Sequence, residues 1–86
     1  MNNLYSEYKN THNIKLREFS EDIDEDRLVW HRDLEDRLLK VINNNNSWKI
    51  QIDNELPRDI DHVFIPKLTY HRLIKGEGNL IISITF

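Results

Sequence analysis

The 86-residue sequence contains no cysteine and no alanine, and it has only two glycines and two prolines. Without cysteine the chain can form neither a disulfide nor a thiolate metal site, which fits a reducing compartment. Alanine is the strongest helix former, so its absence argues against a helical protein. Isoleucine, valine, threonine and aromatic residues fill many apolar positions instead, and these residue types favour β-strands.

Other absences narrow the classes of function. The net charge is −3 at pH 7 with both signs mixed, so the chain lacks the basic footprint of a nucleic-acid-binding protein. No apolar run approaches the roughly 18–20 residues needed to span a bilayer. The first residues show neither the basic nor the apolar region of a secretory signal. We therefore expect a cytoplasmic protein without a nucleic-acid or membrane partner.

The length and the hydrophobic pattern predict a single all-β domain. Turn signals recur every ~8–12 residues and separate about seven short strands, which is typical of a β-sandwich or small barrel. Residues 1–12 are expected to be a frayed tail or an arm that adds to a sheet, and residues 13–86 to form the barrel. The expected strands are 13–19, 28–33, 37–43, 48–52, 62–65, 70–75 and 80–86. A domain of this size buries a limited core, which favours a homodimer.

Two segments carry the candidate site. His31 and Asp33 alternate on one expected strand and therefore share a face. His71 follows a proline-led turn on another strand. Two imidazoles and one carboxylate can hold a divalent transition metal and leave positions open for a ligand. The alternative is a hydrogen-bonded polar network without metal, because the Arg37 guanidinium is always charged, cannot bind a cation and would pair naturally with Asp33.

The spacing of these residues resembles the two motifs of the cupin superfamily. The first cupin motif has two histidines one residue apart, then a glutamate and a glycine; the second has glycine, proline, glycine and histidine. The corresponding strings here are His31-x-Asp33-x3-Arg37-x6-Asn44 and Ile60-x5-Pro66-x-Leu68-x2-His71. The wider string from Val29 to Arg37 also resembles a group of very small cupin-like proteins, some of them phage-encoded.

The cupin resemblance implies a small double-stranded β-helix (a cupin-like jelly-roll barrel) that forms a homodimer. His31 and His71 match ligand histidines, and Asp33 stands where the second histidine would be. Arg37 replaces the ligand glutamate. Asn44, Ile60 and Leu68 replace glycines, and since leucine rarely adopts a positive φ, we expect the turn at Leu68 to be built differently.

These observations predict a small cupin-like protein that binds a small anionic molecule inside the barrel. The metal would be iron, manganese, nickel or zinc, held by His31, Asp33 and His71, or there would be none. Arg37, and Tyr70 at the mouth of the barrel, would contact the ligand. An enzyme of this kind would be a metal-dependent oxygenase or isomerase, although the sequence assigns no catalytic residue. The alternative is a non-catalytic structural or accessory module, including a viral one, in which the His/Asp/Arg cluster stabilises the fold.

Tryptophan and leucine residues complete the prediction for the core. Trp48 alternates in phase with Ile50 and Ile52, which favours a place in the core. If His31 faces the interior, then Leu28 and Trp30 face outward.

Overall fold

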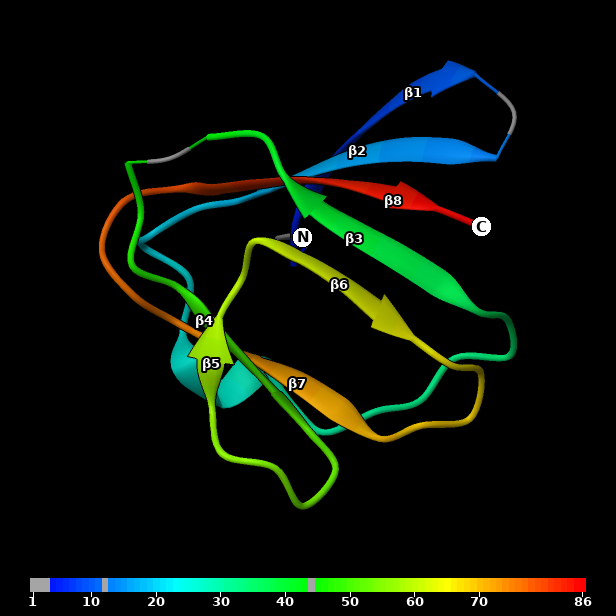
Figure 1. Ribbon diagram of the computed structural model, residues 1–86. Helices are drawn as coiled ribbons and strands as arrows, with labels where there is room; N and C mark the ends of the chain where they lie inside the picture. Colours follow the sequence, from blue (N-terminus) through cyan, green and yellow to red (C-terminus); the bar gives the residue numbers. More distant parts are fainter. Residues whose placement is uncertain (1–3, 12, 44) are drawn as a thin grey trace.

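The computed structural model describes residues 4–11, 13–43 and 45–86, which form two antiparallel sheets (Figure 1). The five-stranded sheet has the order β1-β2-β8-β3-β6, and the three-stranded sheet has the order β5-β4-β7. The strands are β1 (Ser6–Thr11), β2 (Ile14–Phe19), β3 (Arg37–Val41), β4 (Lys49–Ile52), β5 (Arg58–Asp59), β6 (His62–Ile65), β7 (His71–Ile74) and β8 (Leu80–Thr85).

Helical structure within the described residues is confined to a single 3-10 turn, η1 (Glu25–Arg27). The Asp24 side chain caps it by accepting a hydrogen bond from the backbone N–H of Asp26 at 3.0 Å. No helix in this part of the chain combines the length and apolar character needed to cross a membrane.

The core fills the space between the two sheets, and each strand contributes alternate residues to it. Leu80, Ile82 and Ile84 of β8 are buried while the residues between them are not. From the smaller sheet, Ile50 and the neighbouring Trp48 face them and are almost completely buried. The indole Nε1 of Trp48 donates to the carbonyl of Gly78 at 2.7 Å. The prediction that Trp48 belongs to the core is confirmed.

Most of the expected strands are present, but residues 28–33 do not form one. Only His31 in this segment pairs with another strand, through an isolated bridge to His71. The expected orientation is also wrong for Leu28, which is buried in the core, whereas Trp30 is exposed as expected. The reason is that Leu28 directly follows η1 and packs inward there, so strand alternation does not govern its direction. The two-residue strand β5 was not expected, because a pattern with period two cannot be recognised over two residues.

The N-terminal segment forms the outer strand of the larger sheet. Strand β1 pairs with β2 from Ser6 opposite Glu18 to Thr11 opposite Ile14. Two regions named in the sequence analysis include residues outside the described ones: the expected tail, with residues 1–3 and His12, and the first motif, with Asn44 at a motif glycine. Between β7 and β8, Gly78 has a φ of +78°, which favours glycine.

Candidate metal centre and adjoining cavity

The backbone brings the two predicted histidines together. His31 and His71 form a bridge in which each N–H donates to the other's carbonyl, at 3.0 and 2.9 Å. Directly opposed residues of an antiparallel pair project to the same side, so the two imidazoles become neighbours. Their ring centroids lie 4.3 Å apart, edge to face. The bridge therefore places side by side two rings from segments that are distant in the sequence.

Hydrogen bonds to backbone carbonyls orient both rings. Nδ1 of His31 lies 3.1 Å from the carbonyl of Val29, and Nδ1 of His71 lies 2.8 Å from the carbonyl of Thr69. A carbonyl oxygen can only accept, so each Nδ1 carries the proton and donates it. In the neutral ring, Nε2 then keeps its lone pair. This arrangement is typical of metal-binding histidines, whose second ring nitrogen is commonly held by a carbonyl or carboxylate.

Asp33 completes the cluster with a carboxylate oxygen that has no hydrogen bond. Its Oδ2 lies 3.3 Å from Nε2 of His71, is buried, and has no hydrogen-bond partner in the part of the chain that the structure describes. Ligand atoms of His31, Asp33 and His71 all lie within 4.8 Å of one another. A buried acceptor without a donor costs free energy, about 1–3 kcal/mol for a neutral group and more for a charged one. A cation between these atoms would remove that cost.

Burial lowers the pKa of His71 below its ordinary value. The Thr69 carbonyl and the Asp33 carboxylate oppose this shift, whereas the charges on His31 and Arg37 reinforce it. His71 is therefore neutral at pH 7, and its Nε2 does not carry a proton that could be donated to Asp33. Nε2 of His71 and Oδ2 of Asp33 therefore lie 3.3 Å apart without a hydrogen bond between them.

Arg37 lies beside Asp33 but does not close the site. Its Nε is 3.5 Å from Asp33 Oδ2, a single long contact and not a bidentate pair. The same guanidinium donates two hydrogen bonds to one oxygen of Glu35, from Nε at 3.0 Å and from Nη2 at 2.8 Å. The predicted pairing with Asp33 is thus present as a weak contact, and the stronger partner is Glu35.

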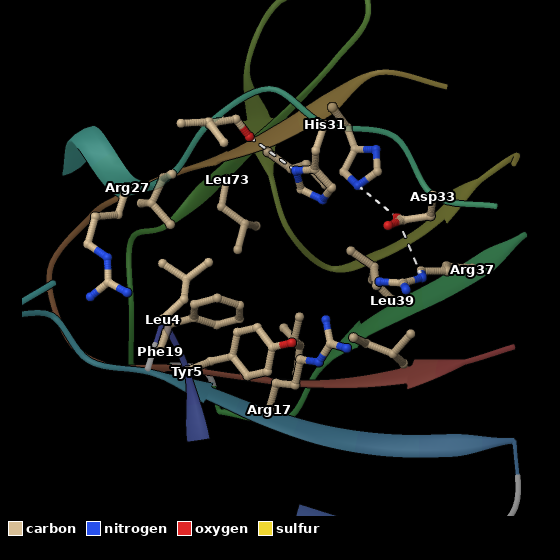
Figure 2. Close-up of a pocket in the computed structure, with 16 residues that line it drawn as sticks. Leu4, Tyr5, Arg17, Phe19, Arg27, His31, Asp33, Arg37, Leu39 and Leu73 are labelled. Atoms are coloured by element: carbon tan, nitrogen blue, oxygen red, sulfur yellow. Dashed lines mark hydrogen bonds and ion pairs between the residues drawn. The ribbon is translucent and has the colours of Figure 1, made fainter. Parts of the chain in front are cut away.

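A cavity of about 340 Å³ adjoins the three candidate ligands (Figure 2). His31, Asp33, Arg37 and His71 line one end, and His31 is also exposed to solvent, so the cluster lies at the rim. Apolar side chains form much of the remaining wall: Leu4, Phe19, Leu28, Val29, Leu39, Ile50, Leu73, Ile82 and Ile84.

The sequence analysis missed two arginines and a tyrosine in the wall of this cavity. Arg17, Arg27 and Tyr5 line it together with the predicted residues. Arg17 could have been found from its spacing, because it lies two residues before Phe19 on β2 and so shares the face of that buried ring. The opposite face of the strand carries Ile14 and Leu16 and is more apolar, so the pattern favoured that face as the buried one.

Tyr70 does not line the cavity. It precedes His71, so its side chain lies on the opposite face of the chain, and 48% of its surface is exposed. The guanidinium of Arg32 lies 5.2 Å from the centre of its ring. The predicted contact between Tyr70 and a ligand is not supported by the residues that line the cavity, and it stays a prediction.

The turn before His71 places Leu68, at the position of a motif glycine, in a left-handed backbone conformation. Leu68 has a φ of +64°, so the expectation of a differently built turn is wrong. The left-handed conformation costs a residue with a side chain about 1–2 kcal/mol. Two hydrogen bonds hold the turn: Leu68 N–H donates to the Asp33 carbonyl at 2.7 Å, and Lys67 N–H donates to Oδ1 of Asp36 at 2.8 Å. These bonds fix the turn against the segment that carries Asp33.

Replacing Leu68 with Gly is expected to raise the free energy of unfolding by about 0.5–1 kcal/mol. Relief of the left-handed strain outweighs the greater freedom of glycine in the unfolded chain. Urea unfolding followed by circular dichroism measures the change. Leu56→Gly is the control, because Leu56 is 85% exposed and is not among the residues with positive φ, so this change should be slightly destabilising. Equal effects of the two changes would contradict the strain argument.

The chain resembles solved structures, but no protein-family model and no curated protein matches it. Protein NMB1881 from Neisseria meningitidis superposes with a TM-score of 0.65 at 15% identity, over 100% of this chain and 88% of that one. A candidate mannose-6-phosphate isomerase from Ralstonia eutropha JMP134 gives 0.60 at 14% identity, over 94% and 81%. The Fe(II) form of HppE gives 0.63 at 14% identity, over 95% of this chain and 48% of that one.

These likenesses establish the fold as a small, all-β, cupin-like barrel in one domain, as the motif resemblance implied. At such low identity they carry the fold and no activity. They do not bear on the narrower resemblance to phage-type proteins. That resemblance, the homodimer and the cytoplasmic location stay predictions.

Proposed function

We propose that this protein holds a divalent transition metal at His31, Asp33 and His71 and binds a small anionic molecule in the adjoining cavity. The observation that carries the proposal is the buried Oδ2 of Asp33, which has no hydrogen-bond partner among the described residues and lies 3.3 Å from Nε2 of His71. Ligand atoms of His31, Asp33 and His71 lie within 4.8 Å of one another, so a single metal ion could bind all three and satisfy this oxygen.

The donor set favours a transition metal over calcium or magnesium. Imidazole nitrogens suit iron, manganese, nickel and zinc, whereas calcium and magnesium prefer sites made of oxygens alone. When bound by three protein ligands, such a metal has open positions at which it can act as a Lewis acid toward a ligand oxygen. The Val29 and Thr69 carbonyls would keep the two imidazoles in the required orientation.

The charge on the cavity wall supports an anionic ligand. Three arginines, Arg17, Arg27 and Arg37, line the cavity, and Asp33 is the one acidic residue among the described residues that line it. Coordination of a divalent cation by Asp33 would make the wall more positive still. HppE, an iron(II) protein, shows that a cupin-like barrel can hold a metal ion. An oxygenase or an isomerase would both be compatible with such a site.

Metal analysis tests the proposal. Protein purified without chelator is expected to contain nearly one equivalent of a transition metal, measured by inductively coupled plasma mass spectrometry. After chelation it should take up Zn(II) again in a calorimetric titration. His71→Gln should lower this affinity by more than about 100-fold, because it removes a direct ligand. His31 is exposed, so His31→Gln should be better tolerated than His71→Gln. It provides a second ligand variant if His71→Gln fails to fold.

His62→Gln is the matched control, because the His62 side chain is 69% exposed, lies 3.8 Å from the Asp61 carboxylate and is not one of the three candidate ligands. This variant should bind Zn(II) like the wild type. If the protein is isolated without metal and takes up none on titration, the metal proposal is wrong. The alternative function then applies, in which the cluster is a stabilising network in a non-catalytic module.

A further inference from the structure

Two of the arginines that line the cavity, Arg37 and Arg17, differ in how far their N–H groups are already engaged. Arg37 donates two hydrogen bonds to Glu35, contacts Asp33, and has its guanidinium 5.1 Å from the centre of the Phe86 ring. Its orientation is therefore fixed by groups of the protein itself. It adds positive charge to the cavity, while its Nε and Nη2 atoms are already engaged by carboxylates of the protein.

Arg17 is held equally firmly and yet leaves two donor groups available. Its Nε donates to Oε1 of Glu7 at 2.7 Å, and its guanidinium stacks 4.3 Å from the centre of the Tyr5 ring. The Tyr5 ring in turn packs against Phe19 at 5.4 Å. Neither Nη nitrogen of Arg17 bonds to an acceptor among the side chains that the structure describes (residues 4–8, 13–43 and 45–86). The side chain is only 14% exposed and belongs to the cavity wall (Figure 2).

We propose that Arg17 is the anion-recognition residue of this cavity and that its ligand is a small organic monoanion with an apolar body. This inference rests on the anion-binding cavity of the proposed function. The two Nη groups of a guanidinium match the two oxygens of a carboxylate. Arg17 is already stacked and oriented, so little further ordering is needed when the carboxylate binds.

Charge and shape select the class of ligand. Glu7 lies against Arg17 and offsets part of its charge. The charge that remains at Arg17 therefore matches a monoanion better than a dianion. Phe19, Leu28 and Leu73 give part of the wall an apolar character. A cavity of about 340 Å³ is at the small end of ligand pockets, so the apolar body must be short.

Hexanoate and its uncharged counterpart hexanamide are the probes for this proposal. We expect the wild type to bind hexanoate about 10- to 100-fold more tightly than hexanamide, because only the carboxylate forms a charge-assisted pair with Arg17. Hexane-1-phosphonate in its dianionic form should bind more weakly than hexanoate. Arg17→Met should abolish the preference for hexanoate over hexanamide, and Arg17→Lys should retain only part of this preference. Isothermal titration calorimetry and ¹H–¹⁵N correlation spectra measure these affinities.

Arg72→Met is the matched control for the loss of one arginine. Arg72 is also partly buried, donates through Nε to Gln51 at 3.0 Å and stacks 5.0 Å from the centre of the Trp30 ring, but it does not line the cavity. This variant should keep the full preference for hexanoate. A preference that survives in Arg17→Met, or one that is lost equally in Arg72→Met, would overturn the assignment.

Titrations in EDTA and with one equivalent of Zn(II) separate this proposal from the metal centre. If no Zn(II) binds but the Arg17-dependent preference persists in EDTA, the metal centre is wrong and the role of Arg17 is supported. If Zn(II) binds at His31, Asp33 and His71 but hexanoate binds no better than hexanamide in either condition, the role of Arg17 is overturned and the metal centre is unaffected.

Discussion

Replacing Asp33 with Asn is expected to change stability in opposite directions with and without metal. In EDTA the free energy of unfolding should rise by about 1 kcal/mol, because the buried Oδ2 has no hydrogen bond in the wild type. An amide nitrogen in its place could donate to Nε2 of His71. Arg37 would keep Glu35 as its counter-charge at 2.8 Å. With Zn(II) at about 1,000 times its dissociation constant, the wild type should gain about 4 kcal/mol that the variant largely lacks.

Urea unfolding followed by circular dichroism, in EDTA and in Zn(II), measures this reversal. Asp59→Asn removes the same charge from a surface pair with Lys49, in which the Asp59 side chain is 85% exposed. Surface pairs of this kind contribute little, so the control should lose no more than about 1 kcal/mol in either condition. If Asp33→Asn is destabilising to the same extent in both conditions, the carboxylate belongs to a structural network and not to a metal centre.

Replacing Trp48 with Ala is expected to be the most destabilising single change in the apolar core. The side chain is 1% exposed, and truncation of a buried tryptophan costs about 3–5 kcal/mol. It also leaves the Gly78 carbonyl without its donor. A domain of this length has a total stability of roughly 4–13 kcal/mol, so the variant should lose a large share of it and unfold at a markedly lower temperature. Thermal unfolding followed by circular dichroism measures the loss.

Two further variants show whether burial is the cause. Trp48→Phe keeps most of the apolar volume and should cost about 1–3 kcal/mol, chiefly through the lost hydrogen bond. Trp30→Ala removes the other tryptophan, which is 40% exposed and stacked by Arg72, and should cost less than about 1 kcal/mol. Similar losses for Trp30→Ala and Trp48→Ala would contradict the assignment of Trp48 to the core.

The strands that the sequence predicts well are those with one buried face. In β4 and β8 the apolar residues alternate with polar or less buried ones, and both strands appear where expected. The segment 28–33 contains apolar residues and yet is not a strand, because Leu28 is buried through the end of η1 and the rest pairs only at His31. Local alternation reports that one face is buried, but it does not report which segment has a pairing partner.

Leu68 shows the same limit for backbone conformation. Its residue type argues against a positive φ, yet hydrogen bonds from the turn to Asp33 and Asp36 hold it at +64°. Both acceptors lie in a segment more than thirty positions earlier in the sequence. The local preference of leucine was therefore overruled by tertiary contacts, which the sequence pattern does not contain.

The amino-acid sequence alone determined the class of this protein: strand-forming residues, regular turns and a His-x-Asp and Pro-x4-His spacing define a small cupin-like barrel with a candidate metal site. Tertiary structure decided which atoms of that site are available. It turned both Nδ1 groups toward carbonyls, left Oδ2 of Asp33 without a donor, bound Arg37 to Glu35, and placed Arg17 in the cavity wall. The physical reason is that hydrogen-bond partners and burial depend on distances between segments far apart in the chain, whereas residue type and spacing are local.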